Sequence, residues 1–371
     1  MKMTGIIFSN IYDTPMGDLT KLRTVASMPF GGRYRFIDFV LSNMVNSHVS
    51  SIGVITKYNY RSLMNHLGGG AEWDLNRKGA NFHIIPPFAT GVTNVYRGNL
   101  EALSNAISFL NSSGGEHVIM CDSSVICNID FRDALKSHIE SGADVTAICN
   151  SSIEDYECDA SDLILTEKDG ICDDLAIGDT PTKKSKIGMG MFIIEKSLLR
   201  EAIKSCVSRG RYSFEKDFLL TGFVNKTLKI NTYVFEGAVL RNHNIVSYFK
   251  NSFRLMEPHI RRDIFRSDAV IRTKVRDEAP TFYHRGSSLK ECLIADGCNI
   301  YGSAENSILF RGVVIEEGAE VKNSIIMQGS RIEKNASVNY AIIDKNAVIS
   351  KGSGISGAPL TPIIIHKGET I

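Results

Sequence analysis

Over roughly the first 250 positions, short apolar runs alternate with longer stretches in which apolar residues have helical spacing. Four runs are expected to form buried parallel strands: residues 4–8, 51–56, 117–120 and 144–148. Three stretches are expected to form helices: residues 37–45, 99–110 and 133–141, the last ending at Gly142. Strands that alternate with helices in this way predict an α/β domain with a doubly wound sheet and helices on both of its faces.

From Ser307 onward the pattern changes, because apolar positions recur every 17 residues. The corresponding positions are Ile308, Ile325 and Ile342; Leu309, Ile326 and Ile343; Ile315, Ile332 and Ile349; and Val321, Val338 and Ile355. Glycine or asparagine, which tolerate positive φ, occupy two turn positions in each copy: Gly312, Gly329 and Asn346, and Gly318, Asn335 and Gly352. The apolar spacing of about six residues predicts a hexapeptide-type parallel β-helix; an antiparallel β domain with chance similarity is the alternative.

These two patterns divide the chain into three parts. We assign residues 1–247 to the α/β domain, 248–286 to a charged and largely helical linker, and 287–371 to the β-helix. The end strands of a short β-helix lack partners, so they need a cap or a neighbouring subunit. The chain is therefore expected to assemble into an oligomer.

The charge and cysteine content narrow the functional classes. The 371 residues include 42 Lys and Arg against 41 Asp and Glu, a net charge of +1 that recruits neither nucleic acid nor an anionic membrane. No apolar run is long enough for a membrane span, and the start of the chain has no secretory pattern. The eight cysteines include no CxxC pair, which indicates reduced thiols, no metal site and a cytoplasmic location.

Several motifs in the α/β part occur in the order and spacing of one known family. They are FGGRYRFIDFVLSNMVNS at residues 30–47, GVIT at 53–56, HLGGG at 66–70, EWDL at 72–75 and YRG at 96–98. The chain resembles ADP-glucose pyrophosphorylase, also called glucose-1-phosphate adenylyltransferase. The resemblance implies a Rossmann-like nucleotidyltransferase domain and a C-terminal left-handed parallel β-helix. It also implies adenylyl transfer from ATP to glucose 1-phosphate with Mg²⁺, which releases pyrophosphate and makes ADP-glucose for glycogen or starch.

The phosphate-binding loop departs from the family pattern. Where the family has GGxGxRLxxLT, this chain has NIYDTPMGDLT at residues 10–20. The glycines are replaced by Asn10, Ile11 and Asp13, and the arginine by Pro15, so side chains, a negative charge and a missing amide oppose phosphate binding. The lysine of a nearby family segment is replaced by Val25.

Both family aspartates that hold Mg²⁺ are also replaced. The resemblance aligns the first with Ser124 and the second with Asn242, neither of which carries a negative charge. Asp122 could substitute for the first only if the strand end shifted by two residues. The resemblance therefore implies no catalytic residue, no metal site and no catalytic cofactor in this chain.

In lacking these residues, the chain most resembles the non-catalytic, regulatory subunits of the family. Such a subunit would assemble with a homologous catalytic subunit, which would use the Mg²⁺, in a heterotetramer; a homotetramer of this chain is the alternative. One alternative is a weakly active adenylyltransferase that relies on Asp122. Another is an acyltransferase of the hexapeptide class, which the absence of histidine between Ser287 and Ile355 disfavours.

The resemblance also marks residues that would bind regulators or retain part of the substrate site. Arg23, Arg33 and Arg35 are expected to bind a phosphorylated-metabolite effector between the domains; pairing of Arg33 and Arg35 with Asp38 is the alternative. Vestigial nucleotide or substrate contacts are expected at Trp73, Asp74, Tyr96 and Phe214. For Trp73, packing in the core is an equally good explanation.

Overall fold

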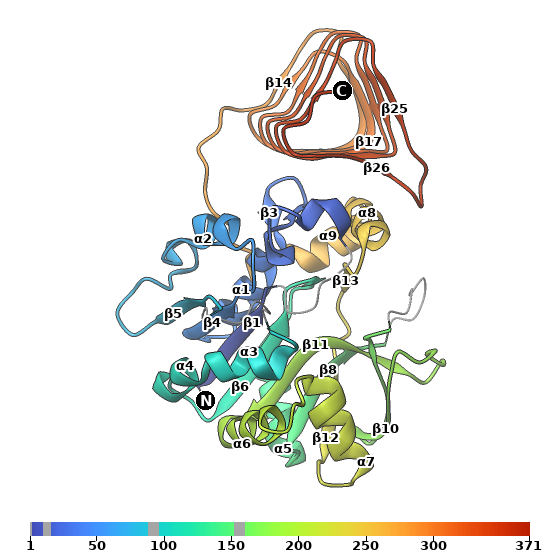
Figure 1. Cartoon of the computed structure of the whole chain (residues 1–371). Coiled ribbons are helices and arrows are strands. Elements are labelled where there is room, and N and C mark those ends of the chain that lie inside the picture. Colours follow the sequence, from blue (N-terminus) through green and yellow to red (C-terminus); the bar gives the residue numbers. More distant parts are fainter. Residues whose placement is uncertain (1, 10–15, 88–95, 152–159) are drawn as a thin grey trace.

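The computed structural model describes residues 2–9, 16–87, 96–151 and 160–371, which form a layered α/β domain beside a coil of parallel strands (Figure 1). The described residues of the α/β domain form a nine-stranded sheet. Its order is β5 (Asn81–Ile85), β4 (Ser51–Ile55), β1 (Met3–Phe8), β6 (His117–Asp122), β11 (Lys186–Glu195), β8 (Val145–Asn150), β12 (Ile230–Val234), β10 (Ile171–Ile177) and β9 (Leu163–Lys168). Strand β1 lies parallel to both β4 and β6, so the expected parallel core of the sheet is confirmed.

Two strands of this sheet, β10 and β11, differ from the expected parallel arrangement. Strand β10 lies antiparallel to β12 and β9. Strand β11 lies antiparallel between β6 and β8, which makes the sheet mixed. A buried apolar run has no feature that reports strand direction, because periodicity reflects burial alone. Two short antiparallel ribbons complete the strands of this domain: β2 (Pro29–Phe30) with β3 (Tyr34–Arg35), and β7 (Val125–Ile126) with β13 (Leu240–Arg241).

Helices cover both faces of the sheet. The helices are α1 (Phe36–Asn46), α2 (Arg61–Leu67), α3 (Asn99–Asn105), α4 (Ile107–Ser112), α5 (Phe131–Ser141), α6 (Lys196–Val207) and α7 (Thr221–Val224). Apolar side chains of α1, α2 and α5 pack on one face, and those of α3, α4 and α6 pack on the other. The stretch expected as one helix at 99–110 is divided at Ala106, and α5 ends at Gly142, which has a φ of 55°.

The C-terminal part is the parallel β-helix that the repeat predicts, and Figure 1 shows its triangular cross-section. One side consists of β14 (Phe282–Tyr283), β16 (Asn299–Ile300), β18 (Val314–Ile315), β21 (Arg331–Ile332) and β24 (Val348–Ile349). The other two sides consist of β15 (Ser288–Ile294), β17 (Ser303–Leu309), β19 (Glu320–Lys322), β20 (Ile325–Ile326), β22 (Ser337–Asn339), β23 (Ala341–Ile343), β25 (Gly354–Ser356) and β26 (Ile363–Ile365). Ile308, Ile325 and Ile342 are direct partners in neighbouring coils, which confirms the predicted register.

A connecting segment joins the two parts and helps to hold them together. It contains α8 (Ile245–Arg254) and α9 (Pro258–Ile264), and residues 265–281 then continue without helix or strand to β14. An apolar cluster crosses the boundary between the domains, with Phe39 and Tyr248 on one side and Ile325 and Ile342 on the other. This packing sets the coil against the α/β domain with its β17, β20 and β23 side, and so creates the cleft described below.

The described part of the chain has no helix that is both long and apolar enough to cross a membrane. The cysteines in that part are free thiols, and most of them are buried.

Candidate functional site

The two positions aligned with the metal carboxylates of the family lie side by side beyond the end of β6. Ser124 precedes β7 and Asn242 follows β13, and these two strands pair with each other. The Asn242 amide Nδ2 donates to the Ser124 carbonyl at 3.0 Å and to the Leu240 carbonyl at 3.1 Å. The Asn242 backbone N–H also donates to Ser124 at 3.2 Å. Asn242 is completely buried, and its amide holds together the two backbone segments that carry Ser124 and Leu240.

Asp122 is the last residue of β6, and its carboxylate turns toward the same chain segment. Oδ1 of Asp122 accepts a hydrogen bond from the Ser124 backbone N–H at 2.8 Å. Burial raises the pKa of Asp122, although the hydrogen bonds to Ser124 and Ser123 and the charge of His243 act in the opposite direction. The raised pKa disfavours the charged form that a metal ligand requires.

These three residues do not fit a Mg²⁺ ion. Mg²⁺ favours oxygen ligands in near-octahedral geometry and is usually held by carboxylates. Asn242 directs amide hydrogens at two carbonyls, and only Asp122 can become an anion. Within the described ranges, no cluster of three or more His, Cys, Asp or Glu side chains could hold a metal ion.

The other positions expected to have lost substrate contacts have separate surroundings. Asn10, Ile11, Asp13 and Pro15 of the substituted loop lie outside the described residues. Val25 is buried in a short 3₁₀ helix, Val25–Ser27, and packs in the apolar cluster between the domains. Its side chain offers no charge to a ligand.

The structure does not bring the four expected vestigial contacts together. Trp73 is completely buried and donates from its indole N–H to Ser42, which is a packing role and leaves no surface for a ligand. Asp74 is exposed and pairs with Arg77 at 3.0 Å. Tyr96 and Phe214 are buried in the apolar cluster on the opposite face of the sheet from Trp73.

A concentration of positive charge lies instead in a cleft between the α/β domain and the coil. A cavity of about 360 Å³ and an adjoining one of about 40 Å³ share the side chains of Arg35, Arg276, Gln328 and Lys345. The larger one is also lined by Leu22, Arg23, Ser62, Asn346 and Lys367, and the smaller one by Pro29, Gly32, Arg33, Tyr34, His66, Lys274, Phe310 and Arg311. None of these described lining residues is acidic, so the cleft offers a concentrated positive charge.

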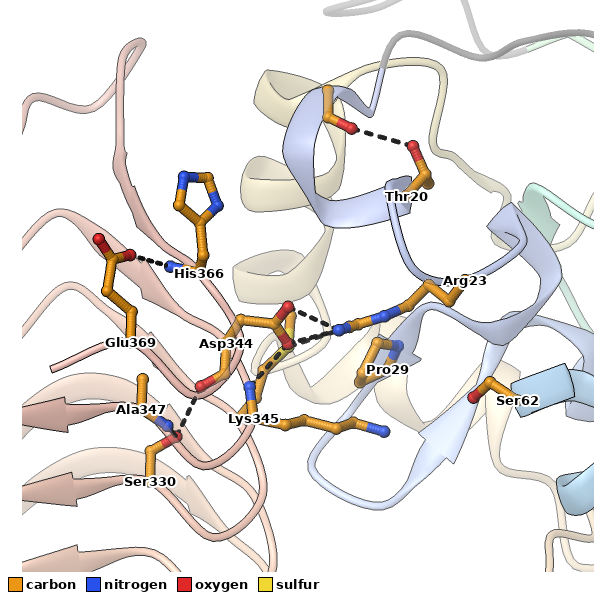
Figure 2. A network of polar contacts seen from close by, with 12 residues as sticks. Thr20, Arg23, Pro29, Ser62, Ser330, Asp344, Lys345, Ala347, His366 and Glu369 are labelled. Carbon is orange, nitrogen blue, oxygen red and sulfur yellow. Dashed lines mark hydrogen bonds and ion pairs between the residues drawn. The ribbon is translucent and has the colours of Figure 1, made fainter. Parts of the chain in front are cut away.

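Arg23 joins the two domains at the edge of this cleft. Its Nη2 contacts Oδ1 and Oδ2 of Asp344 on the coil at 2.8 and 2.6 Å, as Figure 2 shows. Both residues are buried, at 4% and 3% exposure, so the pair is shielded from water. Arg23 therefore pairs with a residue of the coil. The sequence predicted an effector contact for Arg23 and gave no sign of this ion pair.

Arg35 lies deeper in the cleft than Arg33. Its guanidinium Nη1 donates to the backbone carbonyl and to Oγ of Ser62 at 2.9 and 3.0 Å. Burial and nearby arginines lower the pKa of Arg35 to about 10, although Asp38 opposes this shift. Asp38 accepts from the backbone N–H of Arg35, at 2.9 Å, rather than from its guanidinium, and its other oxygen lies 2.5 Å from Nε2 of His66.

Arg33 and Arg311 lie on opposite sides of the smaller cavity. Arg33 is exposed, and its guanidinium carbon lies 5.6 Å from the ring centre of Tyr34. Arg311 is buried, at 6% exposure, and its Nε and Nη2 atoms have no hydrogen-bond partner among the described residues. Buried donors without partners are costly, so an anionic ligand would satisfy a real deficit here.

The coil residues of the cleft were not expected from the sequence, although a signal for them was present. Arg311, Gln328 and Lys345 are 17 residues apart and occupy one position in successive repeats. Each follows the buried strand residues that face the α/β domain, so a long polar side chain at this position enters the cleft. The linker residue Arg276 had no comparable signal in the sequence.

Similar proteins agree with the architecture. Residues 6–157 match the nucleotidyl transferase family, and residues 278–359 match the GlmU-like C-terminal hexapeptide family. The chain is 31% identical over 325 residues to the glycogen biosynthesis protein GlgD of Bacillus subtilis (strain 168), covering 86% of this chain and 83% of that protein.

Two further relatives extend this result. The GlgD protein of Geobacillus stearothermophilus is 34% identical over 326 residues, with coverage of 86% and 83%. The glucose-1-phosphate adenylyltransferase of Fervidobacterium nodosum is 30% identical over 321 residues, with coverage of 86% and 77%. The chain therefore belongs to the nucleotidyltransferase family that includes the glycogen biosynthesis protein GlgD and glucose-1-phosphate adenylyltransferase.

Proposed function

We propose that this chain is a regulatory, catalytically degenerate subunit of glucose-1-phosphate adenylyltransferase in bacterial glycogen biosynthesis. It would assemble with a homologous catalytic subunit into a heterotetramer, or into a homotetramer where that partner is absent, and in the mixed assembly it would change the response of the catalytic subunit to a phosphorylated metabolite. The catalytic partner would supply the Mg²⁺ site for the reaction of ATP with glucose 1-phosphate.

One observation carries this proposal. The neutral Asn242 amide is buried against the carbonyls of Ser124 and Leu240, at the position where the resemblance expects a metal carboxylate. Loss of a metal or general acid–base contact typically lowers a rate by a factor of about 10² or more. The cationic cleft between the domains, in contrast, retains the side chains that a phosphate ligand requires.

The direct test compares the purified chain, a catalytic homologue and their mixture in ADP-glucose synthesis with Mg²⁺. We expect no turnover from this chain alone and altered activation or substrate affinity in the mixture. Rapid turnover by the isolated chain would overturn the proposal. Unchanged kinetics of a homologue that co-purifies with it would equally contradict a regulatory role.

The anion cleft is tested in the mixed enzyme with Arg35→Ala, which removes a guanidinium that lines both cavities. We expect a higher half-activating concentration of a phosphorylated activator, by about tenfold for the loss of a charge-assisted contact. Arg132→Ala is the matched control, because Arg132 is exposed on α5 and pairs locally with Asp130. Identical activation curves for both variants would remove Arg35 from the effector site.

A second candidate is a weakly active adenylyltransferase, and the position of Asp122 at the carboxyl end of β6 favours it. If Asp122 binds a metal, Asp122→Asn will abolish a slow Mg²⁺-dependent turnover that the unaltered chain shows. The regulatory proposal expects no such turnover to be present in the first place.

A further inference from the structure

Lys345 occupies the wall that the two cavities of the cleft share. It follows Asp344 in the turn after β23, and its side chain extends from the coil toward the α/β domain (Figure 2). Lys345 lines both cavities, so a ligand in either one would meet its amine.

Positive groups from several other segments surround this amine. They are Arg23 just before the 3₁₀ helix Val25–Ser27, Arg33 and Arg35 around β3, Lys274 and Arg276 in the linker, Arg311 on the coil and Lys367 near its end. His66 on α2 also lines the cleft, but burial lowers its pKa, so its ring is neutral near pH 7. Among the described carboxylates near the cleft, Asp296 and Glu278 act on Arg311, and Asp344 and Asp38 are already engaged. Asp344 pairs with Arg23, and Asp38 contacts His66 and the Arg35 backbone N–H.

Among the described residues, no carboxylate lies within salt-bridge distance of the Lys345 amine. Loss of hydration lowers the pKa of Lys345 to about 7, and the charges of Arg35, Arg23 and Arg276 add to this effect, while Asp344 opposes it. Near neutral pH about half of the molecules would therefore carry a neutral amine at this position. An anion in the cleft reverses the balance, because an opposite charge within about 4–6 Å favours the charged form of a lysine.

We propose that an anion entering this cleft binds together with a proton, and that the amine of Lys345 takes up that proton. The neutral amine accepts one proton from water or buffer and becomes an ammonium ion, which then pairs with the bound anion. The inference rests on the proposed anion-binding role of the cleft. By linkage, proton uptake makes anion binding tighter as the pH falls through about 7 and weaker as the pH rises.

The test uses sulfate as the probe, because sulfate itself does not change its charge near neutral pH. Calorimetric titration of the full chain at about pH 7 in Tris and in Bis-Tris, whose ionisation enthalpies differ, measures the protons bound per sulfate. We expect about half a proton per sulfate, since Lys345 would be half-protonated before binding and fully protonated after it. If Lys345 stays fully protonated in the complex, affinity for sulfate should be about fiftyfold lower at pH 9 than at pH 7.

Two variants assign the proton. Lys345→Arg keeps the positive charge but does not titrate in this range, so we expect sulfate binding with no proton uptake and little dependence on pH. Lys367→Arg is the matched control, because Lys367 is exposed to water in the same cavity, and it should leave uptake at about half a proton. Lys345→Met should also abolish uptake and weaken sulfate binding.

Three results would overturn the inference in distinguishable ways. Sulfate binding without proton uptake in the unaltered chain would exclude proton coupling while leaving the anion cleft intact. Proton uptake that persists in Lys345→Arg would assign the proton to another group, such as His66, which lines the smaller cavity and responds to the charge at position 345. Absence of sulfate binding at every pH would remove the cleft as an anion site, whereas the regulatory role is decided separately by the assay with a catalytic homologue.

Discussion

The carboxyl end of β6 and the cleft between the domains differ in how completely their polar groups are satisfied. At the first, Asn242 is buried with its amide bonded to two carbonyls of neighbouring segments. At the second, several cations converge around Lys345, and the described lining residues include no acidic side chain. The Asn242 amide is satisfied without a ligand, although Ser123 Oγ beside it has no hydrogen-bond partner among the described residues, whereas Arg311 in the second region has two buried donors without partners.

This difference separates a site that has become part of the scaffold from one that has kept the means to bind. Hydrogen bonds satisfied within the protein stabilise the fold and leave no group for a substrate. Like charges held together cost stability, and natural proteins retain such strain mainly where function requires it. The comparison favours the cleft as the place of the proposed ligand and a structural role for the Asn242 amide.

The largest effect on stability should come from Arg23→Ala, which breaks the buried ion pair between the α/β domain and the coil. Removing Arg23 leaves Asp344 buried without its counter-charge, so the free energy of unfolding should fall by about 3–5 kcal/mol. Chemical denaturation measures this change. Arg331→Ala, which removes an exposed partner of Glu316, is the control and should cost less than about 1 kcal/mol.

The next largest effect on stability should come from Asn242→Asp, at the carboxyl end of β6. It places a carboxylate against the carbonyls of Ser124 and Leu240, so we expect a loss of about 2–4 kcal/mol and no Mg²⁺-dependent activity. The exposed Asn225→Asp provides the control for the same chemical change. Preserved stability together with metal-dependent turnover would show that the β6 end is still a working site.

Arg311→Met, in contrast, should stabilise the fold. It removes a buried guanidinium that has two unpartnered donors but keeps a side chain of similar length, so the free energy of unfolding should rise by about 1 kcal/mol. The same variant should bind sulfate more weakly. Arg285→Met, on an exposed part of the coil, should change neither quantity. A loss of stability in Arg311→Met would show that the cleft is not strained.

The smallest expected effect is the dependence of stability on pH. The pKa of Lys345 is about 7 in the folded chain and lies near its ordinary value of 10.5 in the unfolded chain. Between these values the unfolded chain binds more protons, so stability rises with pH and is lowest below about pH 7. From pH 7 to 8 we expect a gain of about 1 kcal/mol in the unaltered chain that Lys345→Met lacks. Equal slopes for both proteins would place the titration elsewhere.

Much of the coil followed from the sequence because its determinants are local. The 17-residue spacing predicted the pairing of Ile315 with Ile332 and of Val321 with Val338, and the structure confirms both. Gly312 and Asn335 have φ values of 66° and 58°, as expected for their turn positions. The parallel strands of the α/β core could also be predicted from the sequence. The direction of β11 could not be predicted, because it depends on the path of the chain between strands.

What the sequence alone determined is therefore the repeat and the order of the domains, and the resemblance added the expectation that neutral residues such as Asn242 replace charged ones. Only the tertiary structure decided which charges meet. Arg23 and Asp344 are separated by 321 positions, yet they share one buried contact. Lys345 faces Arg35 and Arg276 for the same reason, because packing of the coil on the α/β domain sets these contacts. Local spacing records turns and burial, and it holds no information about which distant surfaces pack together.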